Sequence, residues 1–199
     1  MIVYHGSSVL FDSFDLEHAL EGDGKAKFGY GVYVTSSYKS AAHYAFNKRR
    51  PENRDYYVYT LEIPDRTNDN CLSLLKGVRV NDAILDKCQS KLSEYFLYEA
   101  TVEGTPFRKY LANRLLGLHD TPKKMISKTT VEGEKLASQF LLSIGVELIE
   151  WPFTWTKPEG DKNYAVLDDQ KVKVVCIDKV ELDDKKQLIP GSEQRIKTL

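Results

Sequence analysis

The sequence lacks the features that would assign it to several common functional classes. Its formal net charge is only -1 over 199 residues, so no overall charge draws it toward nucleic acid or an anionic membrane. No stretch is long and apolar enough to cross a bilayer, and Met1 leads directly into Ile2-Val3-Tyr4 without the basic and apolar regions of a signal peptide. We therefore expect a cytoplasmic protein with no membrane partner, and export by a leaderless route stays open.

The sequence also lacks the patterns of disulfide frameworks, metal sites and common nucleotide sites. The three cysteines, Cys71, Cys88 and Cys176, have no metal-ligand spacing, which indicates free thiols in a reducing compartment. There is no GxGxxG fingerprint, no P-loop and no paired Cys/His spacing. We expect no metal, and any nucleotide site must be built in another way.

What is present favours one folded domain over residues 1–199. Hydrophobic residues make up 42% of the chain, which is enough for a core. The patterns predict strands over 2–5, 32–35, 55–63, 146–150, 163–167 and 171–177, a helix over 132–144 ended by Gly145, and an insert of two or three helices at about 71–130. A loop over 151–162 and a frayed tail from about 183 are also expected. Strands and helices do not alternate regularly, so the prediction is an α+β fold with a mixed or antiparallel sheet.

The rest of the chain is organised around residues 28–44. The stretch begins Phe28-Gly29-Tyr30-Gly31-Val32-Tyr33, and its glycines allow close approach to the backbone. Ser36 or Ser37 is suited to cap a helix, which Pro51 would stop. On that helix Ala41, Tyr44 and Ala45 lie on or near one face, which leaves a slot with an aromatic wall. Such a slot suits a planar heterocycle.

Three motifs together resemble one enzyme family. They are Tyr4-His5-Gly6-Ser7, the stretch from Phe28 to Tyr44, in which Tyr44 follows Tyr33 by eleven residues, and Asn163-Tyr164-Ala165-Val166-Leu167-Asp168. The pattern resembles the NAD-dependent ADP-ribosyltransferases of the diphtheria-toxin and poly(ADP-ribose) polymerase type, including stand-alone domains of phages and mobile elements. The resemblance covers about half the chain and leaves the insert without a counterpart. It implies the ADP-ribosyltransferase fold, with a split sheet.

The same resemblance implies an activity and its partners. NAD+ would be the co-substrate, and its ADP-ribose would pass to a macromolecular acceptor, either protein or nucleic acid, in a toxin or phage-conflict setting. A cognate inhibitor is a further partner that the resemblance leaves open. NAD+ glycohydrolysis is a related activity.

The resemblance also assigns roles to residues. His5 would hydrogen-bond the adenine-side ribose, and the backbone of Gly6, followed by Ser7, would hold the nicotinamide carboxamide. Tyr33 and Tyr44 would sandwich the nicotinamide ring, whose positive charge suits aromatic walls. The implied catalytic residues are His5, Tyr33 and Asn163, and the implied NAD-binding residues are His5, Gly6, Ser7, Gly31, Tyr33, Ser40 and Tyr44. Ser40 lies one position from the serine of the polymerases, whose place is taken here by Ala41.

Asn163 is the main departure, because the family has a glutamate there that stabilises the oxocarbenium-like transition state. An amide keeps a hydrogen bond but supplies no charge, and such a loss costs roughly 10²–10³ in rate. Three outcomes stay open: Asn163 supports a slower mono-transferase, Glu159 or Asp161 supplies the carboxylate, or the domain binds NAD+ without reacting. Asp168 should face the other side of the strand. We expect no polymer formation.

Overall fold

The computed structural model describes residues 1–19, 26–46, 55–92, 103–118 and 129–198. The strands are β1 (Ile2–Ser7), β2 (Val32–Thr35), β3 (Tyr56–Glu62), β4 (Cys71–Ser73), β5 (Leu148–Pro152), β6 (Lys162–Val166), β7 (Lys173–Val180) and β8 (Gln194–Thr198). The α-helices in these ranges are α1 (Tyr38–Ala45), α2 (Asp82–Leu92), α3 (Gly104–Leu115) and α4 (Val131–Ser143), and 3-10 turns lie at Leu16–His18 and Asp169–Lys171.

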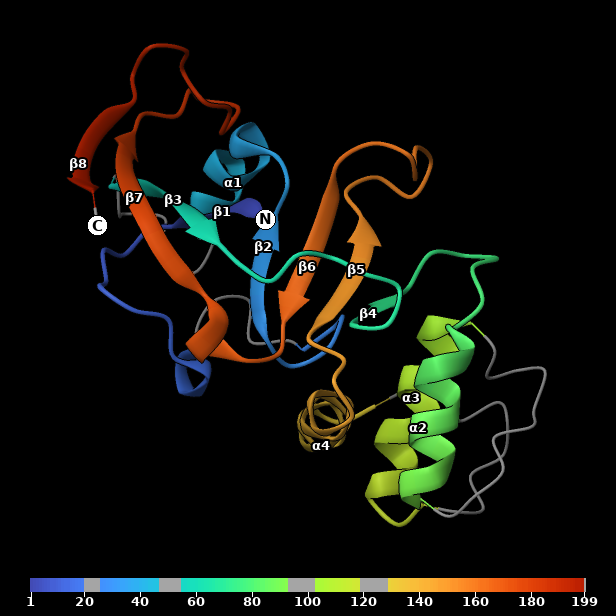
Figure 1. The fold of residues 1–199 in the computed structure, drawn as a ribbon. Helices are drawn as coiled ribbons and strands as arrows, with labels where there is room; N and C mark the ends of the chain where they lie inside the picture. The colour runs from blue at the N-terminus through green and yellow to red at the C-terminus, as the bar shows by residue number, and fades with distance from the viewer. Residues whose placement is uncertain (20–25, 47–54, 93–102, 119–128, 199) are drawn as a thin grey trace.

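The eight strands form one sheet in the order β4-β5-β6-β2-β1-β3-β7-β8 (Figure 1). Strands β4 and β5 are parallel, and the other neighbours are antiparallel. The predicted α+β class with a mixed sheet is therefore confirmed. Both α2 and α3 lie inside the predicted insert, and the remaining parts of the insert, 93–102 and 119–128, are outside the described residues.

The α-helices cover one face of the sheet. Side chains of a strand alternate between faces, and β5 and β6 send Ile149 and Ala165 into the core cluster that holds Leu111 of α3 and Leu141 of α4. At the other end of the same face, Ala41 and Ala45 of α1 pack with Val58 of β3. Two groups of helices thus share the face, with β2 between them.

The opposite face is covered by the segment that follows β1. Phe11, Phe14 and Leu16 are partly buried and pack against a cluster that includes Val3 and Tyr59. The rings of Phe11 and Tyr59 stack, with centroids 4.5 Å apart. The backbone is also fastened, because the Phe11 N–H donates to the Tyr59 hydroxyl over 2.8 Å.

The predicted helix ends are largely confirmed. Ser37 caps α1, and its Oγ accepts the Ser40 N–H over 3.3 Å. Gly145 follows α4 at a φ of 89°, where a side chain would be strained. Helix α1 ends at Ala45, and Pro51 lies outside the described residues.

Three expectations about local structure were wrong. The segment at 71–73 is a strand, because leucines at 72 and 74 have the spacing of a strand as well as of a helix. Trp151 and Pro152 belong to β5, and the loop begins at Phe153. The tail is not frayed, since β8 pairs with β7 and its Arg195 forms an ion pair with Asp178. Those contacts depend on residues distant in sequence, which local pattern does not report.

Candidate functional site

The central feature of the candidate site is a place where two neighbouring strands stop pairing. Met1 and Ile63 exchange two backbone hydrogen bonds, of 2.6 and 3.0 Å. Because hydrogen-bonded pairs alternate along an antiparallel ladder, the N–H and C=O groups of the odd-numbered residues of β1 point toward β3. The groups of Tyr4 and Gly6 then face β2. Tyr4 pairs with Thr35, but no further register pair joins β1 to β2 in the described residues. We call this interruption the seam, and the amide and carbonyl of Gly6 face it.

At the seam, the side chain of His5 on β1 bonds a backbone carbonyl of β2. In the register set by Tyr4 and Thr35, the next pair would join Gly6 to Tyr33, whose carbonyl instead accepts from His5 Nδ1 over 2.7 Å. A carbonyl only accepts, so Nδ1 carries the hydrogen and Nε2 of the neutral ring is left as an acceptor. Burial lowers the pKa of His5 below 6.5, although the bond to Tyr33 acts in the other direction.

The ring of His5 lies on the opposite face of the sheet from the side chains of Tyr33 and Asn163. It packs edge-on against Phe14 and Tyr59, with centroid distances of 5.0 and 6.1 Å. The structure therefore brings His5 to the seam through its Nδ1 atom, and does not bring its ring together with the two predicted tyrosine walls. Its predicted contact with a ribose stays a prediction that would have to use Nε2.

Helix α1 lies directly on Gly6. A Cβ atom at this position would be 1.8 Å from the carbonyl oxygen of Ala41 and 2.7 Å from the backbone nitrogen of Ala45. Both alanines are fully buried. The glycine and the alanines together let the helix approach the strand, and Tyr44 lies between these two alanines in sequence.

Tyr33 is fixed by the turn that precedes it. Its hydroxyl donates to the Gly29 carbonyl over 2.9 Å and accepts the Phe28 N–H over 2.9 Å. Its ring meets Trp151 edge-on at 5.1 Å, and Phe28 stacks on the same indole at 4.4 Å. Burial raises the pKa of the Tyr33 phenol to about 12. At Gly31, which precedes β2, an added Cβ would come within 2.6 Å of the Val166 carbonyl oxygen.

Tyr44 and Asn163 meet on the helix-bearing face. Tyr44 is 51% exposed, whereas Asn163 on β6 is 4% exposed. Burial raises the pKa of the Tyr44 phenol, and a hydrogen bond with the Asn163 side chain lowers it in part. Phe153 stands edge-on to Tyr44 at 6.1 Å.

The two predicted serines do different things. Ser7 Oγ accepts the Val9 N–H over 3.0 Å and so turns the chain after β1. Ser40 is 8% exposed in the first turn of α1, and its N–H donates to Ser37. Neither observation tests a role in binding NAD+, which stays a prediction for both.

The carboxylates proposed as substitutes for a glutamate lie in or beside a surface loop. Glu159 and Asp161 are both exposed in the segment between β5 and β6. Asp168 accepts the Gln170 N–H over 3.1 Å and caps a 3-10 turn. The buried carboxylates of the described residues are bound elsewhere by arginines: Glu134 by Arg108, Glu150 by Arg66 and Asp178 by Arg195.

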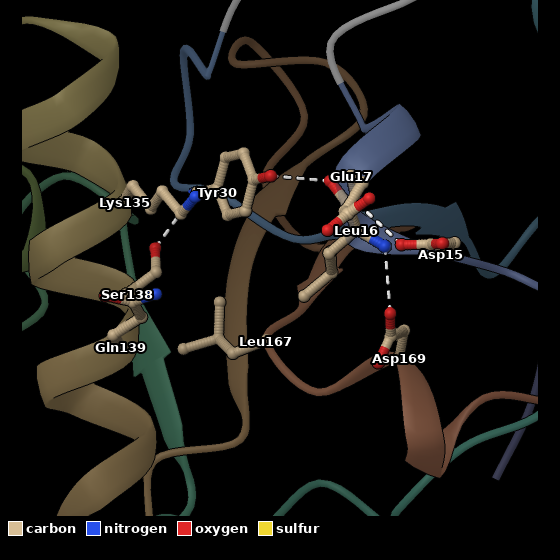
Figure 2. A pocket seen from close by; sticks show the side chains of 9 residues that line it. All are labelled: Asp15, Leu16, Glu17, Tyr30, Lys135, Ser138, Gln139, Leu167 and Asp169. Carbon is tan, nitrogen blue, oxygen red and sulfur yellow. Dashed lines mark hydrogen bonds between the residues drawn. The ribbon is translucent and has the colours of Figure 1, made fainter.

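A separate pocket of about 240 Å³ lies between the Leu16–His18 turn and α4 (Figure 2). Tyr30 stands at its edge, where its N–H donates to Ser138 Oγ over 2.8 Å and its hydroxyl to the Leu16 carbonyl over 2.5 Å. Asp169 accepts the Leu16 N–H over 2.8 Å. None of the predicted site residues lines this pocket.

Sequence reasoning missed the contribution of Arg108, Phe28 and Trp151 to the site. Arg108 is 2% exposed in α3 and donates to the Lys27 carbonyl over 3.0 Å. An arginine in a helical pattern normally indicates a solvated position, so no signal in the sequence identifies it. Phe28 and Trp151 are 123 positions apart, and their stacking becomes visible only once β5 and the turn are placed.

Comparison with known proteins adds one match. Residues 1–91 match the model of a family described as a protein of unknown function (DUF3990). The matched part contains His5, Gly6, Tyr33 and Tyr44, and it ends before Asn163. No curated protein matches the chain.

Two further observations concern sites of other kinds. In the described ranges, no helix has both the length and the apolar character needed to span a membrane. The same ranges hold no group of three or more His, Cys, Asp and Glu side chains suited to a metal ion. The described cysteines are free and buried, and burial raises the pKa of Cys71 and of Cys88 to about 12, so neither is a reactive thiolate.

Proposed function

We propose that the chain is a mono-ADP-ribosyltransferase of the ADP-ribosyltransferase fold that uses NAD+ as co-substrate. The observation that carries the proposal is the seam: the backbone of Gly6 turns an amide and a carbonyl toward β2 without a register partner there. A carboxamide presents the complementary pair, one N–H donor and one C=O acceptor. The exposed ring of Tyr44 stands on the helix that covers Gly6.

The proposal assigns each group a task. Gly6 binds the nicotinamide carboxamide through its backbone, and the Tyr44 ring stacks on the pyridinium, whose charge favours an aromatic face. The carbonyl oxygen of Asn163 accepts from a ribose hydroxyl. His5 keeps the Tyr33 carbonyl out of the ladder, which preserves the seam. Tyr33 holds the turn at Phe28 and Gly29 in place through the hydrogen bonds of its hydroxyl.

The reaction is a substitution at the ribose C1′ atom. The bond from C1′ to the nicotinamide nitrogen breaks, and its electron pair leaves with nicotinamide and neutralises the pyridinium. An acceptor nucleophile forms the new bond to C1′ and gives up its proton. Water in place of the acceptor gives ADP-ribose, which is NAD+ glycohydrolysis. The near-neutral chain leaves the acceptor, whether protein or nucleic acid, and any cognate inhibitor open; we place the reaction in the cytoplasm.

A second candidate is an NAD-binding module without turnover. The amide at position 163 favours it, because Asn163 supplies no negative charge and already interacts with Tyr44. The rate of nicotinamide release would then be roughly 10²–10³ times lower than with a carboxylate, because the developing positive charge on the ribose is less stabilised. Such a module would act by binding a partner. Helices α2 and α3 are the elements proposed to bind it, because they have no counterpart in the family that the sequence resembles.

The test combines binding with turnover. The purified chain is titrated with NAD+ by calorimetry, and release of labelled nicotinamide and transfer of label from the adenosine half are followed in parallel. Tyr44→Ala should weaken NAD+ binding by about 1–3 kcal/mol, the usual worth of stacking on one aromatic ring. Lys39→Ala, an exposed change on the same helix, is the matched control.

Three results separate the possibilities. Binding with nicotinamide release supports the transferase or the glycohydrolase, and label on an acceptor separates these two. Binding without release favours the module. No binding to the wild-type chain contradicts both candidates.

A further inference from the structure

A charged side chain lies in the core beside the candidate site. Arg108 of α3 is 2% exposed and is the largest fully buried side chain of the described residues. Its Nη1 atom donates to Glu134 of α4, which also accepts from the Thr129 hydroxyl. Burial lowers the pKa of Arg108 to about 10, so the guanidinium still carries its charge at neutral pH. Glu134 is equally buried and balances that charge.

The other arm of the guanidinium reaches the candidate site. Nη2 donates over 3.0 Å to the carbonyl of Lys27, the residue before Phe28. The next two residues are held from the other side by Tyr33, which binds the Phe28 N–H and the Gly29 carbonyl. Three consecutive residues, 27 to 29, are thus held through their backbone by side chains of α3 and β2.

The network is more elaborate than packing requires. Arg108 Nε is buried without a hydrogen-bond partner among the residues that the structure describes. Apolar residues of similar volume often stabilise a core as well as a buried ion pair does, or better. What the arginine supplies and an apolar residue lacks is a directed hydrogen bond to one carbonyl.

We propose that Arg108 is a positioning residue that links the helical insert to the candidate site by holding the turn at residues 27–29. The turn sets the rings of Phe28 and Tyr33 against Trp151, at 4.4 and 5.1 Å. Trp151 in turn pairs in register with Asn163. Arg108 therefore acts on the site through the turn and contacts no ligand itself. Its effect on NAD+ rests on the proposed function, whereas its effect on the turn does not.

The test uses a double variant that removes the charges together. Arg108→Met with Glu134→Leu leaves no uncompensated buried charge, so the melting temperature should equal or exceed that of the wild type. Native-state hydrogen exchange at the Phe28 and Tyr30 amides should rise at least about tenfold, with β3 and β7 unchanged. The Kd for NAD+ should rise at least about tenfold.

Two further variants make the test specific. Arg108→Lys keeps a positive charge beside Glu134, but its single nitrogen cannot also reproduce the hydrogen bond to the Lys27 carbonyl. It should therefore show most of the faster hydrogen exchange at Phe28 that the double variant shows. Arg79→Met with Asp82→Leu removes an exposed ion pair of 3.2 Å at the start of α2 and should change neither exchange nor Kd.

Unchanged exchange at Phe28 and Tyr30 in the folded double variant overturns the inference, and so does wild-type exchange in Arg108→Lys. A wild-type chain that does not bind NAD+ contradicts the proposed function alone, because the exchange measurement still decides the role of Arg108.

Discussion

The side chain of Asn163 on β6 lies against the phenol of Tyr44 on α1 and in part lowers the pKa of that phenol, so a buried amide and a half-exposed ring stand next to each other. The two residues are 119 positions apart and come from the second and third motifs of the resemblance. Their contact places the proposed aromatic wall, Tyr44, beside Asn163, the residue that the resemblance aligns with a glutamate. The chemistry of position 163 is therefore the sharpest point at which to test the site.

Asn163→Glu should raise the rate of nicotinamide release by about 10²–10³, because a carboxylate stabilises the developing positive charge on the ribose. The measurement is the single-turnover rate with labelled NAD+. Asn163→Gln has the length of glutamate without its charge, and should give no increase. Glu159→Gln and Asp161→Asn should leave the wild-type rate unchanged; a loss in either would assign the carboxylate role to the loop instead.

Gly6→Ala should lower the free energy of unfolding by at least about 1–3 kcal/mol, as overpacking does in a close-packed interior. The new Cβ would stand 1.8 Å from the Ala41 carbonyl oxygen and force α1 away from β1. Urea denaturation measures the change. Gly160→Ala is the control, because its Cβ would meet nothing nearer than 3.4 Å, and it should stay within about 0.5 kcal/mol. An equally stable Gly6→Ala would show that α1 does not lie against the strand.

His5 should make stability depend on pH in the mildly acidic range. Burial lowers its pKa in the folded state, while the unfolded chain takes up the proton near pH 6.5. Below pH 6.5 the unfolded state therefore binds more protons than the folded state. The contribution of His5 to the free energy of unfolding is complete above that pH. It is lost at up to about 1.4 kcal/mol per pH unit as the pH falls toward the pKa of the folded state.

The comparison that isolates this effect is His5→Asn, which keeps a donor near the position of Nδ1. Its free energy of unfolding should fall less steeply between pH 7 and 5 than that of the wild type. His43→Asn, an exposed change on α1, should follow the wild type. Parallel curves for His5→Asn and the wild type would show that the ring titrates in the folded state as it does in the unfolded chain.

Tyr33→Phe should lower the free energy of unfolding by about 1–3 kcal/mol, because it leaves the Phe28 N–H and the Gly29 carbonyl without their partner. Thermal and urea denaturation measure it. Tyr57→Phe, on the half-buried part of β3, is the control. If the two changes have equal effects, the phenol of Tyr33 does not hold the turn.

Much of the fold followed from local sequence. The alternation in β3, the cap at Ser37 and the glycine after α4 are determined by neighbours within a few residues, and each was predicted from them. Strands β4 and β8 were not, because each depends on a partner strand, and β8 is exposed along its length apart from one half-buried residue. Pairing of that kind is a tertiary property.

The candidate site was only partly predictable. The eleven-residue spacing of Tyr33 and Tyr44 is the basis on which two of its residues are proposed, and their roles stay predictions. The alternation of a strand already implies that the side chains of His5 and Gly6 face opposite ways. The interruption between β1 and β2 could not be predicted, because it lies where the imidazole of His5 bonds the carbonyl of Tyr33, 28 residues later in the sequence. Arg108 was hidden for the same reason, as its partners lie 81 residues before it and 26 after it.

The seam divides the sheet into β4-β5-β6-β2 and β1-β3-β7-β8, and the chain passes between these two sets four times. Neither set is a contiguous piece of sequence, so synthesis cannot complete one before the other is begun. A fragment stopping at residue 91 would hold β2 without β6 and β3 without β7, and both strands would present bare edges open to association with other chains. The C-terminal half thus covers the strand edges that the first half would leave open.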